Sequence, residues 1–280
     1  MNWNLAAILV LLTFVTGLIW LYDKIVLAPR RRRTMAKAEL VIPTSEIERL
    51  KASHTPVIVD LARSLFPVFL IVLLLRSFLV EPFRIPSGSM MPTLLIGDFI
   101  LVNKFSYGIR LPVLDTKVIE IGKPQRGDVV VFRYPEDPSI PFIKRVIGLP
   151  GDLVEYHHAS KVVYINNEPI EQTVDRHRYI GMGSGSDMTG RELRIEHLSE
   201  EVEHAILVIP TRMPFAPIEK WVIQENQYFV LGDNRDNSKD SRFWGTVPEE
   251  NLIGKAFFIW MNWDWANGGI SWQRIGTPIK

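Results

Sequence analysis

Two apolar segments near the start of the chain constrain its fold more than any other feature. Residues 1–22 carry no charged side chain, and residues 5–22 are almost wholly apolar. A helix of that length rises about 27 Å, close to the hydrocarbon thickness of a bilayer. A second apolar run covers residues 64–80 and is interrupted only by Arg76, which is close enough to the end of the run to extend its guanidinium to the interface. The pattern predicts two transmembrane helices, residues 1–22 and 63–80, and disfavours the alternative of buried helices in a soluble core.

The charged residues beside these segments indicate their orientation. A cleavable signal peptide would have basic residues before its apolar core, but residues 1–4 contain none. The basic residues instead follow the first segment, at Lys24 and in the run Arg30–Arg33. By the positive-inside rule we expect residues 23–62 to form a cytoplasmic loop, with the N-terminus and everything after Val80 on the outer side.

The overall composition excludes several classes of protein. Lys and Arg number 32 against 31 Asp and Glu, so no global basic field is available to bind a nucleic-acid backbone. The absence of cysteine excludes disulfides, a thiolate nucleophile and cysteine-ligated zinc. A hydrophobic fraction of 47% argues against intrinsic disorder.

The remaining residues, 81–280, favour strands and turns. Short β-branched and aromatic runs lie between turn residues, which is typical of strands: they cover residues 98–104, 127–133, 161–165, 227–231 and 254–260. Residues 153–226 are more polar, and we expect them to form a smaller, looser inserted subdomain. Within it, Gly181–Gly190 is predicted to be a flexible surface loop, since no helix pattern follows it as a phosphate-binding loop would require. The expected architecture is a mostly β domain of antiparallel sheets, anchored by two N-terminal transmembrane α-helices.

The common catalytic and metal-binding motifs are absent. The chain contains no HExxH, no P-loop and no GxSxG sequence. Of its six histidines, His54 falls in the expected loop and the other five in or beside the insert, so a serine–histidine triad would have to take its base from there. Adjacent His157 and His158 lack a third ligand at suitable spacing, which favours surface histidines. We expect neither a metal nor another cofactor.

Three polar blocks interrupt the β pattern. In Ile85–Leu94 (IPSGSMMPTL), two prolines and a glycine predict an exposed turn that carries Ser87 and Ser89. In Pro141–Asp152, Lys144 and Arg145 interrupt an apolar strand; alternation places them on opposite faces, but both faces are apolar, so it does not indicate which charge is buried. The block Gly232–Gly245 is either a solvated loop or a hydrogen-bond network that supports a site.

A serine and a buried lysine can catalyse hydrolysis without histidine. Moving a lysine pKa from ~10.4 to ~7 requires about 4–5 kcal/mol of destabilisation of the charged form, which apolar neighbours can supply. A neutral Lys144 could then accept the Ser89 proton and later deliver it to the leaving amine.

The three blocks, in this order after a membrane hairpin, resemble those of bacterial type I signal peptidases, which are serine endopeptidases with a Ser/Lys dyad. The motifs SGSMMPTL, KRVIGLPGD and GDNRDNSxDSR carry the resemblance, from about residue 81 to 245. It implies that Ser89 is the nucleophile and Lys144 the general base. It further implies an oxyanion hole formed by the backbone N–H of Ser89 and the hydroxyl of Ser87.

The resemblance also extends to residues around the dyad. It implies that Ser238 orients the lysine amine and that Asp240 and Arg242 form a supporting ion pair. Substrate pockets would be lined by Phe83, Ile85, Pro86, Met90, Leu94, Phe142 and Ile143. The chain departs from many family members in having Phe142 where they have tyrosine, which affects the fine shape of a pocket.

The family implies a substrate and a location. Signal peptides end in small residues, in Ala-x-Ala-like sites, which shallow apolar pockets would admit while rejecting larger side chains. The expected partners are exported preproteins, the phospholipid membrane and, by proximity, the secretion translocon. The expected location is the bacterial cytoplasmic (inner) membrane, as a multi-pass protein. Near the C-terminus, Trp260, Trp263, Trp265 and Trp272 could rest on the lipid interface or pack in a core.

Two alternatives remain open at this stage. A non-catalytic, membrane-anchored β-domain, such as a periplasmic adaptor, would not explain why Ser89 and Lys144 occur together with the third block. A related peptidase dedicated to one precursor, such as a pilus protein, would have the same motifs, and a panel of preproteins would distinguish it.

Overall fold

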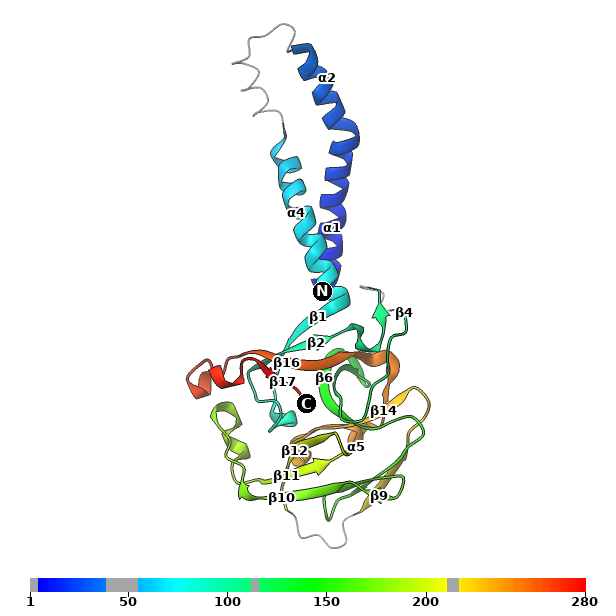
Figure 1. Cartoon of the computed structure of the whole chain (residues 1–280), viewed down its shortest axis with the longest axis vertical. Helices are drawn as coiled ribbons and strands as arrows, with labels where there is room; N and C mark the ends of the chain where they lie inside the picture. The colour runs from blue at the N-terminus through cyan, green and yellow to red at the C-terminus, as the bar shows by residue number, and fades with distance from the viewer. Residues whose placement is uncertain (1–4, 39–54, 112–115, 211–216) are drawn as a thin grey trace. The chain divides into compact units, whose positions relative to one another are not determined.

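The computed structural model describes residues 5–38, 55–111, 116–210 and 217–280. The chain divides into two compact units, one within Met1–Leu79 and Arg110–Val118 and the other within Val80–Ile109 and Ile119–Lys280. The first unit is helical and the second is built mainly of antiparallel strands (Figure 1). This confirms the fold class expected from the sequence.

The helical unit contains two long helical segments. Helix α1 (Leu5–Tyr22) continues through a π-helical segment (Asp23–Leu27) into α2 (Ala28–Ala38), so the charges that end the apolar run do not end the helix. Arg, Lys and Ala, which dominate α2, have high helix propensities. Helix α4 (Val57–Leu74) is likewise extended by a π-helical segment (Leu75–Leu79). The central part of the expected loop, including His54, lies outside the described residues.

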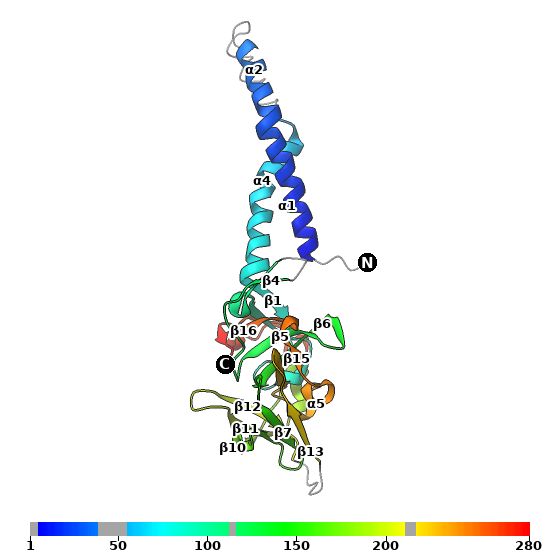
Figure 2. The same cartoon turned by 90° about the vertical axis from the view of Figure 1, so that its right-hand side faces the viewer.

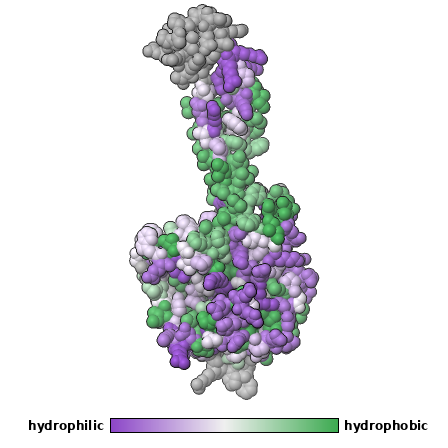
Figure 3. Space-filling model, in the orientation of Figure 1, coloured by the Kyte–Doolittle hydropathy of each residue, from purple (hydrophilic) through white to green (hydrophobic). Residues whose placement is uncertain are grey.

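Helices α1 and α4 lie side by side (Figure 2). The rings of Trp20 and Phe66 stack with centroids 5.4 Å apart, and Gly17 leaves room for the Phe66 ring. Most other apolar side chains of these helices face outward, and Figure 3 shows this apolar surface along the helices. Two segments, Leu5–Thr34 and Val57–Leu79, are long and apolar enough to cross a membrane.

A large antiparallel sheet forms the centre of the β unit. Its strands, in spatial order, are β1 (Val80–Arg84), β2 (Asp98–Asn103), β16 (Leu252–Asn262), β5 (Val129–Tyr134), β6 (Asp137–Gly148), β14 (Gln227–Leu231) and β15 (Val247–Pro248), with β17 (Thr277–Pro278) paired to β16. Strand β5 is buried on both faces: Val129 and Val131 pack in one apolar cluster, Val130 and Phe132 in another. Its continuous apolar sequence follows from this central position.

The inserted region is more regular than the sequence predicts. It forms one sheet of β13 (Ile218–Val222), β7 (Leu153–His157), β8 (Val162–Ile165) and β9 (Glu168–Pro169), and another of β10 (Glu171–Arg178), β11 (Glu192–His197) and β12 (Glu203–Val208). The apolar pattern is weak because nearly every side chain of β10 is exposed. The two remaining strands, β3 (Ile109–Arg110) and β4 (Lys117–Ile119), pair with each other, and the short helix α5 (Ser241–Trp244) follows β14.

The Gly181–Gly190 segment is not the simple surface loop that its composition suggests. Residues Gly183–Met188 form a 3₁₀ helix, with Gly185 and Met188 buried beside Met91. The hydroxyl of Ser184 donates to the Asp264 carboxylate at 2.5 Å. The segment is therefore packed, because its small residues allow close approach. Of the four C-terminal tryptophans, Trp265 and Trp272 are largely exposed.

Candidate active site

Ser89 lies shortly after strand β1, in a short 3₁₀ segment (Gly88–Met90). Asn234 fixes this segment: its backbone N–H donates to the Ser89 carbonyl at 3.0 Å, and its side-chain amide donates to the Gly88 carbonyl at 2.8 Å. Ser87 is exposed, as the sequence predicts, but Gly88 and Ser89 are buried. The expectation of an exposed turn is therefore wrong for the serine itself, because the Gly232–Gly245 block packs over it.

Lys144 brings its amine to this serine from strand β6. It pairs with Val130 of the central strand β5, which holds its backbone within the large sheet. Its Nζ lies 2.8 Å from the Oγ of Ser89 and 2.7 Å from the carbonyl oxygen of Ile143. The lysine is only 4% exposed. Two residues far apart in the sequence thus form a direct, buried serine–lysine pair.

The surroundings of Lys144 disfavour its charged form. Burial lowers the pKa of Lys144 from 10.5 to about 8, while the carboxylates of Asp240 and Asp233 act in the opposite direction. Neither carboxylate is hydrogen-bonded to the amine among the described residues. Loss of hydration therefore outweighs the two nearby negative charges.

An aromatic cluster lies beside the lysine. The Nζ of Lys144 is 5.5 Å from the centre of the Phe142 ring. Phe142 stacks on Tyr134 with centroids 4.5 Å apart, and Trp244 packs edge-on against both rings. This cluster helps to keep the amine away from water.

The expected supporting ion pair is present. Two nitrogens of the Arg242 guanidinium donate to the two oxygens of the Asp240 carboxylate, each at 2.8 Å. Asp240 also caps helix α5 and accepts the backbone N–H of Gly232 at 3.0 Å. The pair thus fixes the turn after β14.

The family resemblance implies that Ser238 orients the lysine amine, but the Ser238 hydroxyl is not hydrogen-bonded to Lys144. Its Oγ is buried and forms no hydrogen bond within the described part of the chain. A Cβ placed on Gly232 would collide with Ser238 and with the carbonyl oxygen of Ser89. Gly232 is therefore required for this close approach, and Ser238 packs beside the backbone of the serine.

The expected pocket residues separate into two groups. Ile85, Met90 and Leu94 are buried in one apolar cluster, and Phe83 and Ile143 pack on that cluster while remaining partly exposed. By contrast, Phe142 packs in a different cluster with Tyr134 and Trp244, and Pro86 is exposed. Five of the seven expected residues therefore share one apolar environment around the Ser89 segment.

Arg145, the other cation of the KR pair, is also buried and forms a second polar centre. Its guanidinium donates to both carboxylate oxygens of Asp233, at 2.9 and 2.8 Å, and to main-chain oxygens of Gly127 and Lys280. The sequence left open which of the two charges is buried. The structure buries both, on opposite faces of β6.

This polar centre continues into the insert, through residues that the sequence analysis did not identify. His204 lies between Asp233 and Glu196, and Glu196 pairs with the buried Arg235. Burial, with the nearby Arg145 charge, lowers the pKa of His204 to about 4. The histidine is therefore neutral at physiological pH. The alternating charges of the third block were the available signal for Asp233 and Arg235, but nothing in the sequence around Glu196 or His204 distinguishes them.

Comparisons with known proteins agree on one family. Residues 58–263 match the model of "Signal peptidase, peptidase S26". The chain is 47% identical to proteins named "Signal peptidase I" from Pseudomonas fluorescens and Pseudomonas aeruginosa, over 94% of this chain and 94% of each relative. A protein of the same name from Haemophilus influenzae is 36% identical, over 98% of this chain and 91% of that protein.

Solved structures were also similar to the chain. A crystal structure of a signal peptidase I from Enterococcus faecalis V583 is 26% identical, with a TM-score of 0.28, and the match covers 49% of this chain and 98% of that one.

Proposed function

The chain belongs to the family of bacterial type I signal peptidases, peptidase S26, and we propose that it cleaves signal peptides with Ser89 as nucleophile and Lys144 as general base. It is a peptidase hydrolase that acts on proteins carrying signal peptides. The observation that carries the assignment of roles is the 2.8 Å contact between the Lys144 Nζ and the Ser89 Oγ, made by a buried lysine. No histidine of the described residues is hydrogen-bonded to Ser89.

The proposed reaction begins with the neutral form of Lys144. With a pKa of about 8, roughly one lysine in ten is neutral at pH 7. The neutral amine accepts the Ser89 proton as the Oγ attacks the scissile carbonyl carbon. The ammonium then delivers that proton to the leaving amine, which releases the mature protein. A water molecule, deprotonated by the same lysine, hydrolyses the acyl-enzyme and restores the serine.

The charge that develops on the substrate oxygen needs donors in fixed positions. The backbone N–H of Ser89 and the hydroxyl of Ser87 are suited to this role. Ser87 has an extended backbone, with φ −134° and ψ 158°, and is exposed. Its hydroxyl is therefore accessible to a substrate that reaches Ser89.

Substrate selection is proposed to depend on the apolar residues around the Ser89 segment. Phe83 and Ile143 are partly exposed on a fully buried base of Ile85, Met90 and Leu94. Such a surface offers shallow apolar contacts, which accommodate small side chains and exclude large ones by steric clash. This supports cleavage after Ala-x-Ala-like sites.

We also propose that the two apolar helical segments anchor the enzyme in the cytoplasmic membrane, with the β unit outside and close to the translocon. The basic run Arg30–Arg33 supports this orientation. A protease added to spheroplasts should digest the β unit but leave the segment around Arg30–Arg33 intact. Protection of the β unit would contradict this orientation.

The direct test of the proposed roles is cleavage of a purified preprotein by the full chain in detergent. Ser89→Ala and Lys144→Ala should each abolish cleavage, and the double variant should be no slower than either single variant, because the pair acts as one unit. Ser106→Ala, which removes an ordinary serine hydroxyl elsewhere, serves as the matched control and should cleave like the wild type. Cleavage by Ser89→Ala at the wild-type rate would refute the assignment.

A further inference from the structure

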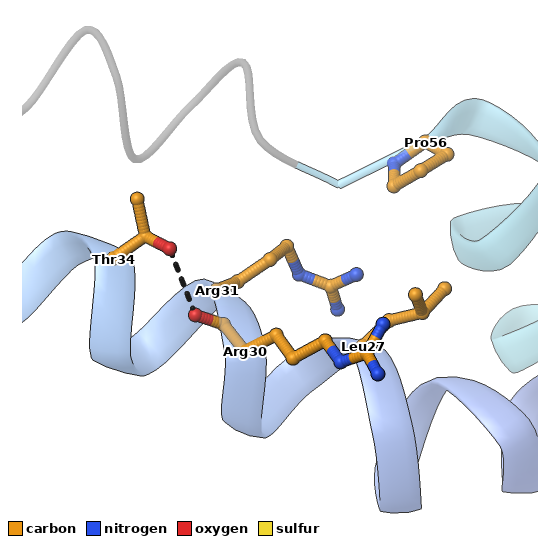
Figure 4. Close-up of a pocket in the computed structure, with 5 residues that line it drawn as sticks. All are labelled: Leu27, Arg30, Arg31, Thr34 and Pro56. Carbon is orange, nitrogen blue, oxygen red and sulfur yellow. Dashed lines mark hydrogen bonds between the residues drawn. The ribbon is translucent and has the colours of Figure 1, made fainter.

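The helical unit contains a pocket that the proposed reaction does not use. It has a volume of about 310 Å³ and is lined by Leu27, Arg30, Arg31, Thr34 and Pro56 (Figure 4). Two arginines line it together with two apolar side chains. The hydroxyl of Thr34 donates to the Arg30 carbonyl at 3.0 Å, so it is already bonded within the helix. The pocket therefore presents cationic groups beside an apolar wall.

The lengths of the two apolar segments place this pocket at a membrane surface. Helix α1 and the π-helical segment after it, Leu5–Leu27, contain 23 residues, of which Asp23 and Lys24 are charged, and the second apolar segment, Val57–Leu79, also contains 23. Helices of that length rise about 34 Å, slightly more than the hydrocarbon core of a bilayer. Leu27 ends the π-helical segment that follows α1, and Pro56 directly precedes α4; both line the pocket. The pocket thus lies where both segments leave the hydrocarbon, at the level of the lipid headgroups.

The side chains of Arg30 and Arg31 are directed toward the level of the lipid headgroups. Side chains on an α-helix lean toward its N-terminus, and the N-terminus of α2 is its membrane end. Figure 4 shows both guanidinium groups directed back toward Leu27 and Pro56. Arg31 pairs with Asp23 at 2.6 Å, whereas Arg30 has no carboxylate partner among the described residues. At least one guanidinium is therefore available to a ligand.

We propose that this pocket binds the phosphate of an anionic phospholipid, with Arg30 and Arg31 as the phosphate ligands. A guanidinium matches phosphate in geometry and charge, and basic segments beside a membrane helix attract anionic lipids. Leu27 and Pro56 contact the less polar part of the same lipid, which a free phosphate ion lacks. The proposal rests on the membrane anchoring put forward above, but not on the catalytic roles of Ser89 and Lys144.

The site can be tested by lipid competition on the full chain in detergent. Equal amounts of phosphatidylglycerol and phosphatidylcholine are added, and the lipids retained by the protein are counted by native mass spectrometry. The wild type should prefer phosphatidylglycerol. Arg30→Gln with Arg31→Gln should weaken that preference by about five-fold for each arginine.

The matched control is Arg32→Gln with Arg33→Gln, which removes the same charge from residues that do not line the pocket. This pair should keep most of the wild-type preference. An equal loss in both pairs, or no preference in the wild type, would overturn the proposal, as would displacement of the lipid by millimolar inorganic phosphate. Flotation with phosphatidylcholine vesicles tests anchoring separately: a protein that does not float refutes the anchoring, whereas one that floats without lipid preference refutes only the site.

Discussion

The two faces of strand β6 hold neighbouring cations in opposite electrostatic settings. Lys144 is 4% exposed and Arg145 is fully buried. On one face, the Lys144 amine is hydrogen-bonded to the Ser89 hydroxyl and the Ile143 carbonyl and lies over the Phe142 ring. On the other, the Arg145 guanidinium is matched by the Asp233 carboxylate and two main-chain oxygens. Burial alone therefore does not determine whether a cation is stable in its charged form. The charged and hydrogen-bonding groups around it determine this.

The difference has a physical cause in the polar partners that each face supplies. A buried charge is stable when a carboxylate and further hydrogen bonds replace its hydration, as they do for Arg145. Lys144 lacks a bonded carboxylate, so burial favours its neutral form. Since successive residues of a strand point to opposite faces, a two-residue stretch can provide both a fixed structural charge and a base.

Exchanging the two cations is the most severe test of this comparison. Lys144→Arg keeps the charge but places at the dyad a group that cannot deprotonate, so kcat/KM should fall by about 10⁴-fold or more at every pH. Arg145→Lys keeps a charge beside Asp233 and should lower kcat/KM by about 10²-fold at most, through misplacement of β6. Steady-state cleavage of a preprotein measures both, and an active Lys144→Arg enzyme would show that the base is another group.

Replacing each cation by methionine should change stability in opposite directions. Arg145→Met removes the guanidinium from the buried Asp233 carboxylate, which keeps only the Thr93 hydroxyl and the neutral His204 beside it; this costs about 3–5 kcal/mol. Lys144→Met instead removes a destabilising charge: the folded-state pKa of about 8 lies below the unfolded value, which corresponds to a cost of about 3 kcal/mol at pH 7. After the loss of two hydrogen bonds, a net gain of about 1–2 kcal/mol should remain.

The pH dependence of folding stability shows whether the Lys144 charge stabilises or destabilises the folded protein. Between pH 8 and 10.5 the unfolded chain binds a proton that the folded chain does not, so wild-type stability rises with pH across this window relative to Lys144→Met. Thermal unfolding in detergent at pH 7 and pH 10.5 should therefore show a Tm advantage of Lys144→Met that is lost at the higher pH. A lower Tm than wild type at pH 7 would contradict the destabilising role of the lysine charge.

The catalytic pH profile should show the same titration. If neutral Lys144 is the active form, kcat/KM rises with pH along a limb centred at about 8, roughly 50-fold between pH 6 and 8. Arg145 and the neutral His204 should contribute no limb in this range. Rates measured with saturating detergent and fixed ionic strength would reveal it, and a limb centred near 6.5 would instead indicate a histidine.

Much of this arrangement could be read from the sequence, and the rest could not for identifiable reasons. Long uncharged runs specify the two apolar helices, and short runs of aromatic and β-branched residues specify strands such as β14. Strand β10 was missed because its side chains face solvent on both sides, which leaves no apolar period. The short distance between the Ser89 Oγ and the Lys144 Nζ depends on Asn234 and Gly232, which hold the serine segment in place. No local sequence pattern encodes such a contact between distant segments.

Ser238→Ala is the smallest perturbation of the lysine's surroundings. It tests whether Ser238 only packs beside the Ser89 backbone or also orients the Lys144 amine. The Ser238 Oγ is buried and has no hydrogen-bond partner among the described residues, so deleting it removes an unsatisfied polar group and should change stability by less than about 1 kcal/mol. If the hydroxyl orients the lysine amine, as the family resemblance implies, kcat should fall about ten-fold while KM and the pH midpoint of kcat/KM stay near wild-type values. A midpoint moved to higher pH would instead show that Ser238 acts by excluding water from Lys144. An unchanged kcat would leave the lysine positioned by its contacts with Ser89 and Ile143 alone, and the orienting role would be wrong.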